Sequence, residues 1–76
     1  MECLLCDLEK GQEGVLLNLR TVSPLQRKLR QFGLIAGTRI SSLGSAPGGS
    51  PMLFRVRGMT LALRREDCCK IPVVIL

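Results

Sequence analysis

Four cysteines are the residues in this sequence that are best equipped for chemistry. They stand in two groups, a C-x-x-C pair formed by Cys3 and Cys6 and an adjacent pair formed by Cys68 and Cys69. Thiolates bind iron and zinc, so one hypothesis is a transition-metal site, iron or zinc, built from all four where the two ends of the chain meet. The spacing differs from that of the usual zinc sites, and the chain has no histidine. The alternative is that these cysteines pack as small apolar side chains.

Catalytic groups of other kinds are scarce. A serine or cysteine nucleophile needs a positioned base, and the sequence places none near one. The glycine-rich stretch at residues 44–50 lacks the Lys-Ser/Thr ending of a phosphate-binding loop. We therefore expect a protein that is not an enzyme and that has no small-molecule substrate.

The charge balance favours an acidic partner. The chain carries 11 Lys and Arg against 6 Asp and Glu, a net charge of +5, which suits phosphate backbones, anionic headgroups or an acidic protein face. A basic face of this kind can also serve solubility alone. Phe32 and Phe54 are the only aromatic residues, which argues against nucleic-acid binding by base stacking but leaves it as an alternative.

Length and hydropathy limit the architecture. Seventy-six residues suffice for one domain, and a domain of this size buries only about 60% of its unfolded surface, so a compact barrel suits it. No basic leader is apparent at residues 1–12, and the apolar run at residues 72–76 is far too short to span a bilayer. We expect a cytoplasmic location.

The clearest predicted helix begins at Pro24. Ser23 is placed as its N-cap, with Gln26 three residues later as the second half of a capping box. Gly33 is expected to end the helix in a left-handed conformation, as in a Schellman motif. Leu25, Leu29 and Phe32 form one apolar stripe that we expect in the core, whereas Arg27, Lys28 and Arg30 face water.

Strands are predicted on either side of this helix. Residues 15–20 alternate as a strand, Gly37 suits a type II turn, and another strand starts near Thr38 before a long polar hairpin tip at residues 41–51. A single helical turn is expected at residues 65–71, and a last strand at residues 71–75.

Residues 52–64 show the strongest alternation. Gly58 marks a bend or bulge between two predicted strands. The inward side chains are expected to be Met52, Phe54, Val56, Met59, Leu61 and Leu63, and the outer face of both strands carries Arg55, Arg57 and Arg64.

Three motifs now appear in a specific order. They are the turn "LEKG" at residues 8–11, the sequence "FGL" followed by "AGT" at residues 32–38, and "RVRG" followed by "LALRRED" at residues 55–67. In this order the chain resembles the FeoA family, small cytoplasmic accessory proteins of bacterial ferrous iron uptake, over residues 4–74. Ala36 and Lys10 stand where family members often carry proline, and the four cysteines are not part of the family pattern.

The resemblance implies a mainly β fold, an SH3-like barrel of about five strands with one short α-helix inserted after the first, as a single domain over residues 1–76. It implies binding to the cytoplasmic G-protein part of the FeoB membrane transporter and modulation of iron uptake. The candidate contact residues are Arg27, Arg30, Leu34, Arg55, Arg57 and Arg64. The alternative is a nucleic-acid-binding or metal-sensing regulatory barrel, because the same fold forms the C-terminal domain of some iron-dependent repressors. Weak self-association also stays open.

Overall fold

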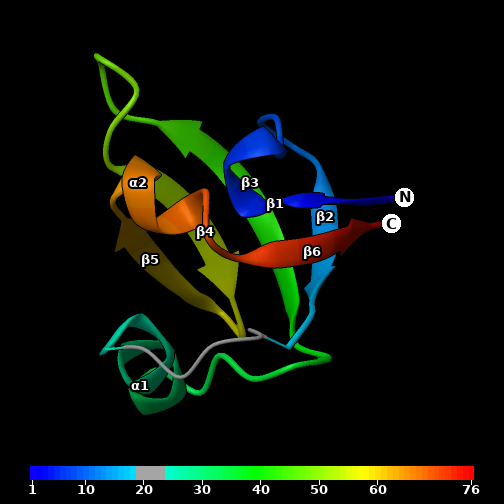
Figure 1. Ribbon diagram of the computed structural model, residues 1–76. Helices are drawn as coiled ribbons and strands as arrows, with labels where there is room; N and C mark the ends of the chain where they lie inside the picture. Colours follow the sequence, from blue (N-terminus) through cyan, green and yellow to red (C-terminus); the bar gives the residue numbers. More distant parts are fainter. Residues whose placement is uncertain (19–23) are drawn as a thin grey trace.

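The computed structural model describes residues 1–18 and 24–76, and the strands in these ranges form one antiparallel sheet. Its spatial order is β1-β6-β2-β3-β4-β5 (Figure 1). The strands are β1 (Glu2–Leu4), β2 (Glu13–Leu16), β3 (Arg39–Ser45), β4 (Met52–Val56), β5 (Met59–Leu63) and β6 (Pro72–Ile75). The helical segments are the 3-10 turn η1 (Leu5–Asp7), α1 (Pro24–Gln31) and the short α2 (Arg65–Cys68).

The sheet is curved like a barrel but is not closed by hydrogen bonds between its edges in the described part of the chain. The edge strands are β1 and β5. The segment η1 directly follows β1, α2 directly follows β5, and these two helical segments pack against each other. The segments η1 and α2 thus cover the opening between the edge strands β1 and β5, which a pairing of these two strands would close. The predicted SH3-like, mainly β fold is confirmed, with six described strands rather than about five, and α1 follows the second strand because β1 precedes it.

The core is formed by the inward side chains of the sheet together with α1, η1 and α2. The predicted inward positions of β4 are confirmed, since Phe54 is fully buried and Met52 and Val56 nearly so. In β5 only Leu63 is fully buried, and Met59 is 50% exposed, because β5 is an edge strand whose first residue follows the hairpin turn. The buried apolar residues are Leu5, Leu8, Leu16, Leu29, Leu34, Ile40, Met52, Phe54, Val56, Leu63, Cys68, Ile71 and Val73.

The predicted hairpin tip at residues 41–51 is wrong in its first half, because β3 continues to Ser45. The pairing with β4 shifts between Ser42 and Gly44, so Leu43 is an extra residue in a β-bulge. Ser42 is buried, and its hydroxyl accepts a hydrogen bond from the Gly44 N–H at 3.3 Å. Polar residues thus occupy strand positions that the alternation of apolar residues could not reveal.

The C-terminus of α1 follows the prediction closely. Gly33 has a φ of +78°. The Leu34 N–H donates to the Leu29 carbonyl at 2.8 Å and the Gly33 N–H donates to the Arg30 carbonyl at 2.9 Å, which is the Schellman pattern. Phe32, expected in the core, is instead 40% exposed, because it follows the last residue of α1 and lies beyond the stripe that Leu29 buries. The predicted N-cap Ser23 lies outside the described residues.

The connection from α1 into β3 also forms as predicted. The Thr38 N–H donates to the Ile35 carbonyl at 3.1 Å, and Gly37 has a φ of +90°, as a type II turn requires. The strand expected at residues 15–20 begins earlier and ends earlier, as Glu13–Leu16, because Glu13 pairs with Ser41 at the start of the β2–β3 ladder. Residues 19 and 20 lie outside the described ranges. The short helix α2 and the last strand β6 agree with the prediction.

Candidate functional site

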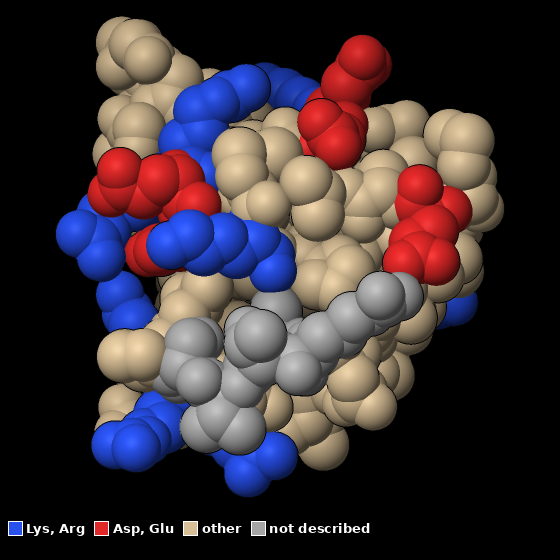
Figure 2. All heavy atoms as spheres, viewed as in Figure 1, with Lys and Arg blue, Asp and Glu red and all other residues tan. Residues whose placement is uncertain are grey.

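Charge is segregated along this chain. All six acidic residues fall within residues 2–13 and 66–67, whereas nine of the eleven basic residues lie between residues 20 and 65. In the fold, this sequence pattern becomes a spatial one. Figure 2 shows red atoms toward the end that carries η1 and α2, and blue atoms without red neighbours at the α1 end of this face.

The basic end of the molecule is built by α1 and the β4–β5 turn. We define the basic end as the exposed side chains Arg27, Lys28, Arg30 and Arg57, with Arg55 next along β4. The two elements touch, because a Cβ placed on Gly33 would lie 3.3 Å from Nη1 of Arg57. The C-terminus of α1 therefore lies beside the turn, and the arginines of both share one surface.

Exposed apolar side chains accompany these cations. Phe32 is 40% exposed, Ile35 54% and Met59 50%. Phe32 and Ile35 flank the C-terminus of α1, and Met59 follows the turn that contacts it. Ile35 also lines an open depression between α1, the end of β2 and the loop before β3, together with Arg30. Cations beside exposed apolar groups are typical of protein-binding surfaces.

The expectation that Arg55, Arg57 and Arg64 share one outer face of the hairpin strands is wrong. Arg57 has a φ of +50° and occupies the two-residue turn with Gly58, which is therefore a turn residue rather than a bulge. The pairing of Met52 with Leu63 carries Arg64 past the far end of the hairpin. Five residues of strand span about 17 Å, so Arg64 lies well away from Arg57.

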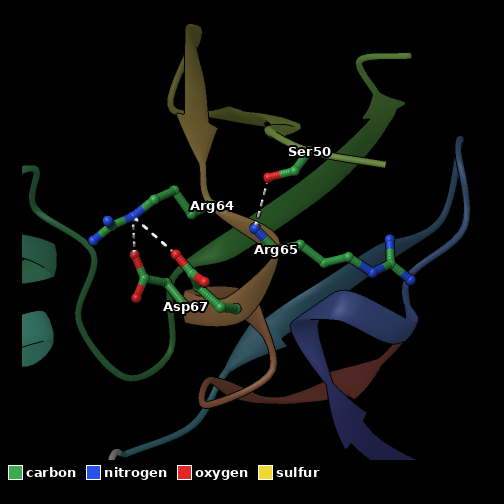
Figure 3. A network of polar contacts seen from close by, with 5 residues as sticks. Ser50, Arg64, Arg65 and Asp67 are labelled. Carbon is green, nitrogen blue, oxygen red and sulfur yellow. Dashed lines mark hydrogen bonds and ion pairs between the residues drawn. The ribbon is translucent and has the colours of Figure 1, made fainter. Parts of the chain in front are cut away.

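Arg64 also has partners of its own. Its Nε donates to Oδ2 of the buried Asp67 at 3.3 Å and lies 3.6 Å from Oε1 of Glu66 (Figure 3). The neighbouring Arg65 donates its backbone N–H to the Ser50 hydroxyl at 3.3 Å, which ties α2 to the β3–β4 loop (Figure 3). Among the predicted contact residues, Arg64 thus belongs to a local network at the acidic end.

Leu34, one of the predicted contact residues, is only 5% exposed, because it packs as the apolar residue of the Schellman motif, and it lines the depression. The sequence did not indicate the exposure of Met59, which was expected to point inward. Ile35 precedes a turn, which was the available signal, whereas the exposure of Met59 depends on β5 being an edge strand.

The four cysteines are drawn together only in part. Cys6 lies in η1 and Cys68 ends α2, with Cys69 directly after it, and these two helical segments pack against each other. Burial above all, and then the neighbouring Cys69, raise the pKa of Cys6 to about 11. In the described ranges no three or more His, Cys, Asp or Glu residues are placed to share a metal ion. One ion held by all four cysteines would therefore need a rearranged chain.

The family follows from a comparison with known proteins. The family model of the FeoA domain matches residues 3–75. The chain belongs to the FeoA family. A curated FeoA relative, the Fe(2+) transport protein A/Fe(2+) transporter FeoB fusion protein of Porphyromonas gingivalis, is 26% identical over 72 residues. That match covers 95% of this chain but 8% of the relative, so the chain spans less than a tenth of the fusion protein.

Solved structures agree with the FeoA assignment. The FeoA-like protein from Clostridium acetobutylicum is 31% identical, with a TM-score of 0.89 over 99% of this chain and 87% of that one. FeoA of Stenotrophomonas maltophilia, solved in complex with zinc and described as an SH3 domain protein, is 26% identical, with a TM-score of 0.74 over 97% and 89%. A manganese-dependent transcriptional repressor shares the fold alone, at 19% identity and a TM-score of 0.87 over 99% of this chain and 37% of the repressor.

These relatives associate the FeoA family with ferrous iron transport. In the described part of this FeoA chain, no helix has both the length and the apolar character needed to cross a bilayer.

Proposed function

We propose that this FeoA domain is a non-enzymatic accessory module of ferrous iron transport, which binds the cytoplasmic G-protein part of a FeoB-type transporter. The observation that carries the proposal is the match to a protein in which FeoA and FeoB are fused, since domains that act together are often joined in one chain. The module acts in the cytoplasm, where that part of the transporter lies.

The basic end is the binding surface in this proposal. Arg27, Arg30 and Arg57 supply positive charge, and Phe32 with Ile35 supplies apolar contact area. Arginine and aromatic residues are over-represented among the side chains that carry binding energy at protein interfaces. An acidic partner surface would be steered toward this end, because the acids of the domain lie at the other end.

The effect on the transporter follows from differential binding. A module that binds one conformation of the G-protein part more tightly shifts its population toward that conformation. A shift from about 10% to about 90% needs a difference of roughly 80-fold in affinity between the two states. The domain then regulates uptake without contacting the transported iron.

The test is a titration of the purified G-protein part of the FeoB-type transporter from the same organism with this domain. The variant Arg57→Glu and the variant Phe32→Ser are each expected to weaken binding at least about 5-fold, since interface anchors cost more than about 1 kcal/mol. The matched control is Lys10→Glu, the same charge reversal placed near Gly44, away from the basic end. Equal losses for Lys10→Glu and Arg57→Glu would assign the effect to net charge and reject the surface.

Nucleic-acid binding is the competing function for the same arginines. It predicts an affinity that falls steeply with salt concentration and is insensitive to Phe32→Ser. Protein binding predicts the opposite response to that variant, because Phe32 contributes apolar area and no charge. A gel shift with duplex DNA at low salt that persists in Phe32→Ser, without any binding to the transporter, would replace the proposed function.

A further inference from the structure

The strand β5 ends the sheet with an edge that pairs with no strand in the described part of the chain (Figure 1). The residues that flank a two-residue hairpin turn exchange hydrogen bonds, so every second residue from Met59 to Leu63 bonds to β4. The backbone N–H and C=O groups of Thr60 and Ala62 therefore point away from the sheet. In residues 1–18 and 24–76 these groups have no hydrogen-bond partner.

This edge lacks the usual protection against pairing with another chain. Natural proteins protect edge strands by charge, proline or a short length. The opposite edge, β1, has only three residues and includes Glu2. The strand β5 has five residues, with the sequence MTLAL, and contains neither a charge nor a proline. Thr60 and Ala62 are exposed, and Met59 is 50% exposed. Such an edge can accept an extended peptide as an additional strand.

We propose that β5 binds an extended segment of the transporter's G-protein part as an additional strand, and that this segment carries an acidic residue beside Thr60. The inference rests on the proposed function for the source of the segment. Hydrogen bonds to the backbone of Thr60 and Ala62 supply affinity, and alternate side chains of the segment supply specificity. The binding surface then continues from the basic end along the edge of the sheet.

The charge around β5 selects an acidic segment. Arg55 pairs with Thr60 across the hairpin, so both side chains lie on the same face of the sheet, and both are exposed. Neighbouring strands lie about 4.8 Å apart, so an added strand would lie roughly 10 Å from β4, within reach of an extended arginine and a carboxylate side chain. Residues 51–65 contain four arginines and no acidic residue. The ion pairs of the described residues involve Arg64 and leave Arg55 unpaired.

The other face of the added strand meets apolar side chains. Met59 is half exposed and Leu61 is half-buried, and both lie on the face opposite to Thr60. Apolar residues on either side of the acidic residue would cover them. The expected segment thus alternates apolar and polar residues, with its acid on the face of Arg55.

A second copy of this domain is the main alternative occupant of the edge. A second β5 strand has no acidic residue to place beside Arg55. Antiparallel pairing of two β5 strands would also bring Arg57 of one copy toward Arg64 of the other, because these arginines follow opposite ends of the strand. Like charges brought together at an interface oppose binding. The charges therefore favour an acidic segment of a different protein.

The experiment is a titration of the purified G-protein part of the FeoB-type transporter with the full chain and two variants at one position. Ala62→Pro removes an N–H that points away from β4, and edge strands tolerate proline at such positions. It should weaken binding at least about 5-fold, because a carbonyl of the segment loses its donor. Ala62→Ser is the matched control, since it keeps the N–H, and it should bind as the wild type does. Equal affinities of Ala62→Pro and Ala62→Ser would overturn the inference.

A second measurement needs no variant. Amide hydrogen exchange of the wild-type domain is followed residue by residue, alone and saturated with the G-protein part. In the free domain the amides of Thr60 and Ala62 should exchange faster than that of Leu61, which bonds to β4. In the complex, both should exchange at least about 10-fold more slowly than in the free domain.

The outcomes separate this inference from the proposed function. Binding without protection of Thr60 and Ala62 would overturn the added strand and leave the transporter as the partner. Absence of any binding would overturn both. Protection of the two amides that rises with the concentration of the domain alone would assign the edge to self-association instead.

Discussion

Two arginines of the β4–β5 hairpin lie in opposite electrostatic surroundings. The ion pairs found among the described residues both involve Arg64, whose guanidinium faces Glu66 and Asp67. The Arg64–Glu66 pair is exposed on both sides and contributes about 0–1 kcal/mol, so it orients Arg64 more than it stabilises the fold. Arg57 lies instead beside the C-terminus of α1, among other cations. Its charge is the one available to a partner.

Arg57 also carries backbone strain. It occupies the first position of the hairpin turn with a φ of +50°, a conformation that asparagine tolerates better than arginine. We expect Arg57→Asn to raise the free energy of unfolding by about 0.5–1 kcal/mol, a part of the roughly 1–2 kcal/mol that this conformation costs. The same variant should weaken transporter binding. Urea denaturation measures the first effect, and Arg55→Asn, within β4, is the control that should bring no gain in stability.

The buried Cys68 thiol is expected to make the free energy of unfolding fall at alkaline pH. Burial above all, helped by Cys6, Cys69 and Asp67, raises its pKa from 9.0 to about 12, with Arg65 acting in the opposite direction. The folded state therefore favours the neutral thiol. This contribution is complete below the unfolded pKa near 9 and is lost as the pH rises from there toward 12.

The corresponding measurement is urea denaturation of the reduced, metal-free protein between about pH 7 and about pH 11. The free energy of unfolding should fall across the upper part of this range, and Cys68→Ala should reduce the slope. The chain has no tyrosine to titrate there, and the lysines are common to both proteins. Identical slopes for the two proteins would show that Cys68 does not contribute.

At the scale of the elements, the bulge in β3 depends on one buried hydroxyl. Ser42 is 2% exposed and accepts the Gly44 N–H within the bulge. We expect Ser42→Ala to cost about 1 kcal/mol, because the amide then loses its partner in a part-buried site. Ser45→Ala, at the exposed end of the same strand, should change stability by less than about 0.5 kcal/mol. Thermal unfolding of both variants checks this, and equal effects would contradict it.

The strands differ in how well the sequence predicts them. In β4 every second residue is apolar and buried, so alternation alone identified both its extent and its inward face. In β3 the buried Ser42 replaces an apolar residue and Leu43 is an extra residue, which interrupts the period of two. The strand β1 has only three residues and is defined by its pairing with β6, which local pattern cannot show.

The residues of the basic end could also be predicted only in part from the sequence. The basic residues of α1 and the hairpin were identified, because exposed positions follow from helical and strand periods. The position of Arg64 was not, since it depends on the tight turn at Arg57 and Gly58 and on the register that follows. Likewise, the packing of η1 on α2, which brings the two cysteine-bearing ends of the chain near each other, could not be read from the sequence. Such contacts are set by tertiary structure.

At the scale of the whole molecule, the two phenylalanines have separate tasks. Phe54 is fully buried at the centre of the core, whereas Phe32 lies 40% exposed at the basic end. Phe54→Ala should cost about 3–5 kcal/mol. A domain of 76 residues has only roughly 4–11 kcal/mol of stability, so much of the margin is lost.

Phe32→Ala is the matched control, expected to cost less than about 1 kcal/mol because the side chain already contacts water. Denaturant melts of both variants, together with the transporter-binding titration, separate the two roles. A large loss of stability in Phe32→Ala would show that it is part of the core.

The position of the chain ends bears on how this domain can be joined to other proteins. Glu2 pairs with Val74, and the Ile75 N–H donates to the Met1 carbonyl at 2.9 Å, so both ends leave at the same side, away from α1 (Figure 1). A linker attached at either terminus would thus hold the domain from the side opposite α1. Tethering raises the local concentration of a partner without occupying the contact surface. Covalent fusion in either order would leave the arginines of α1 accessible to the partner protein.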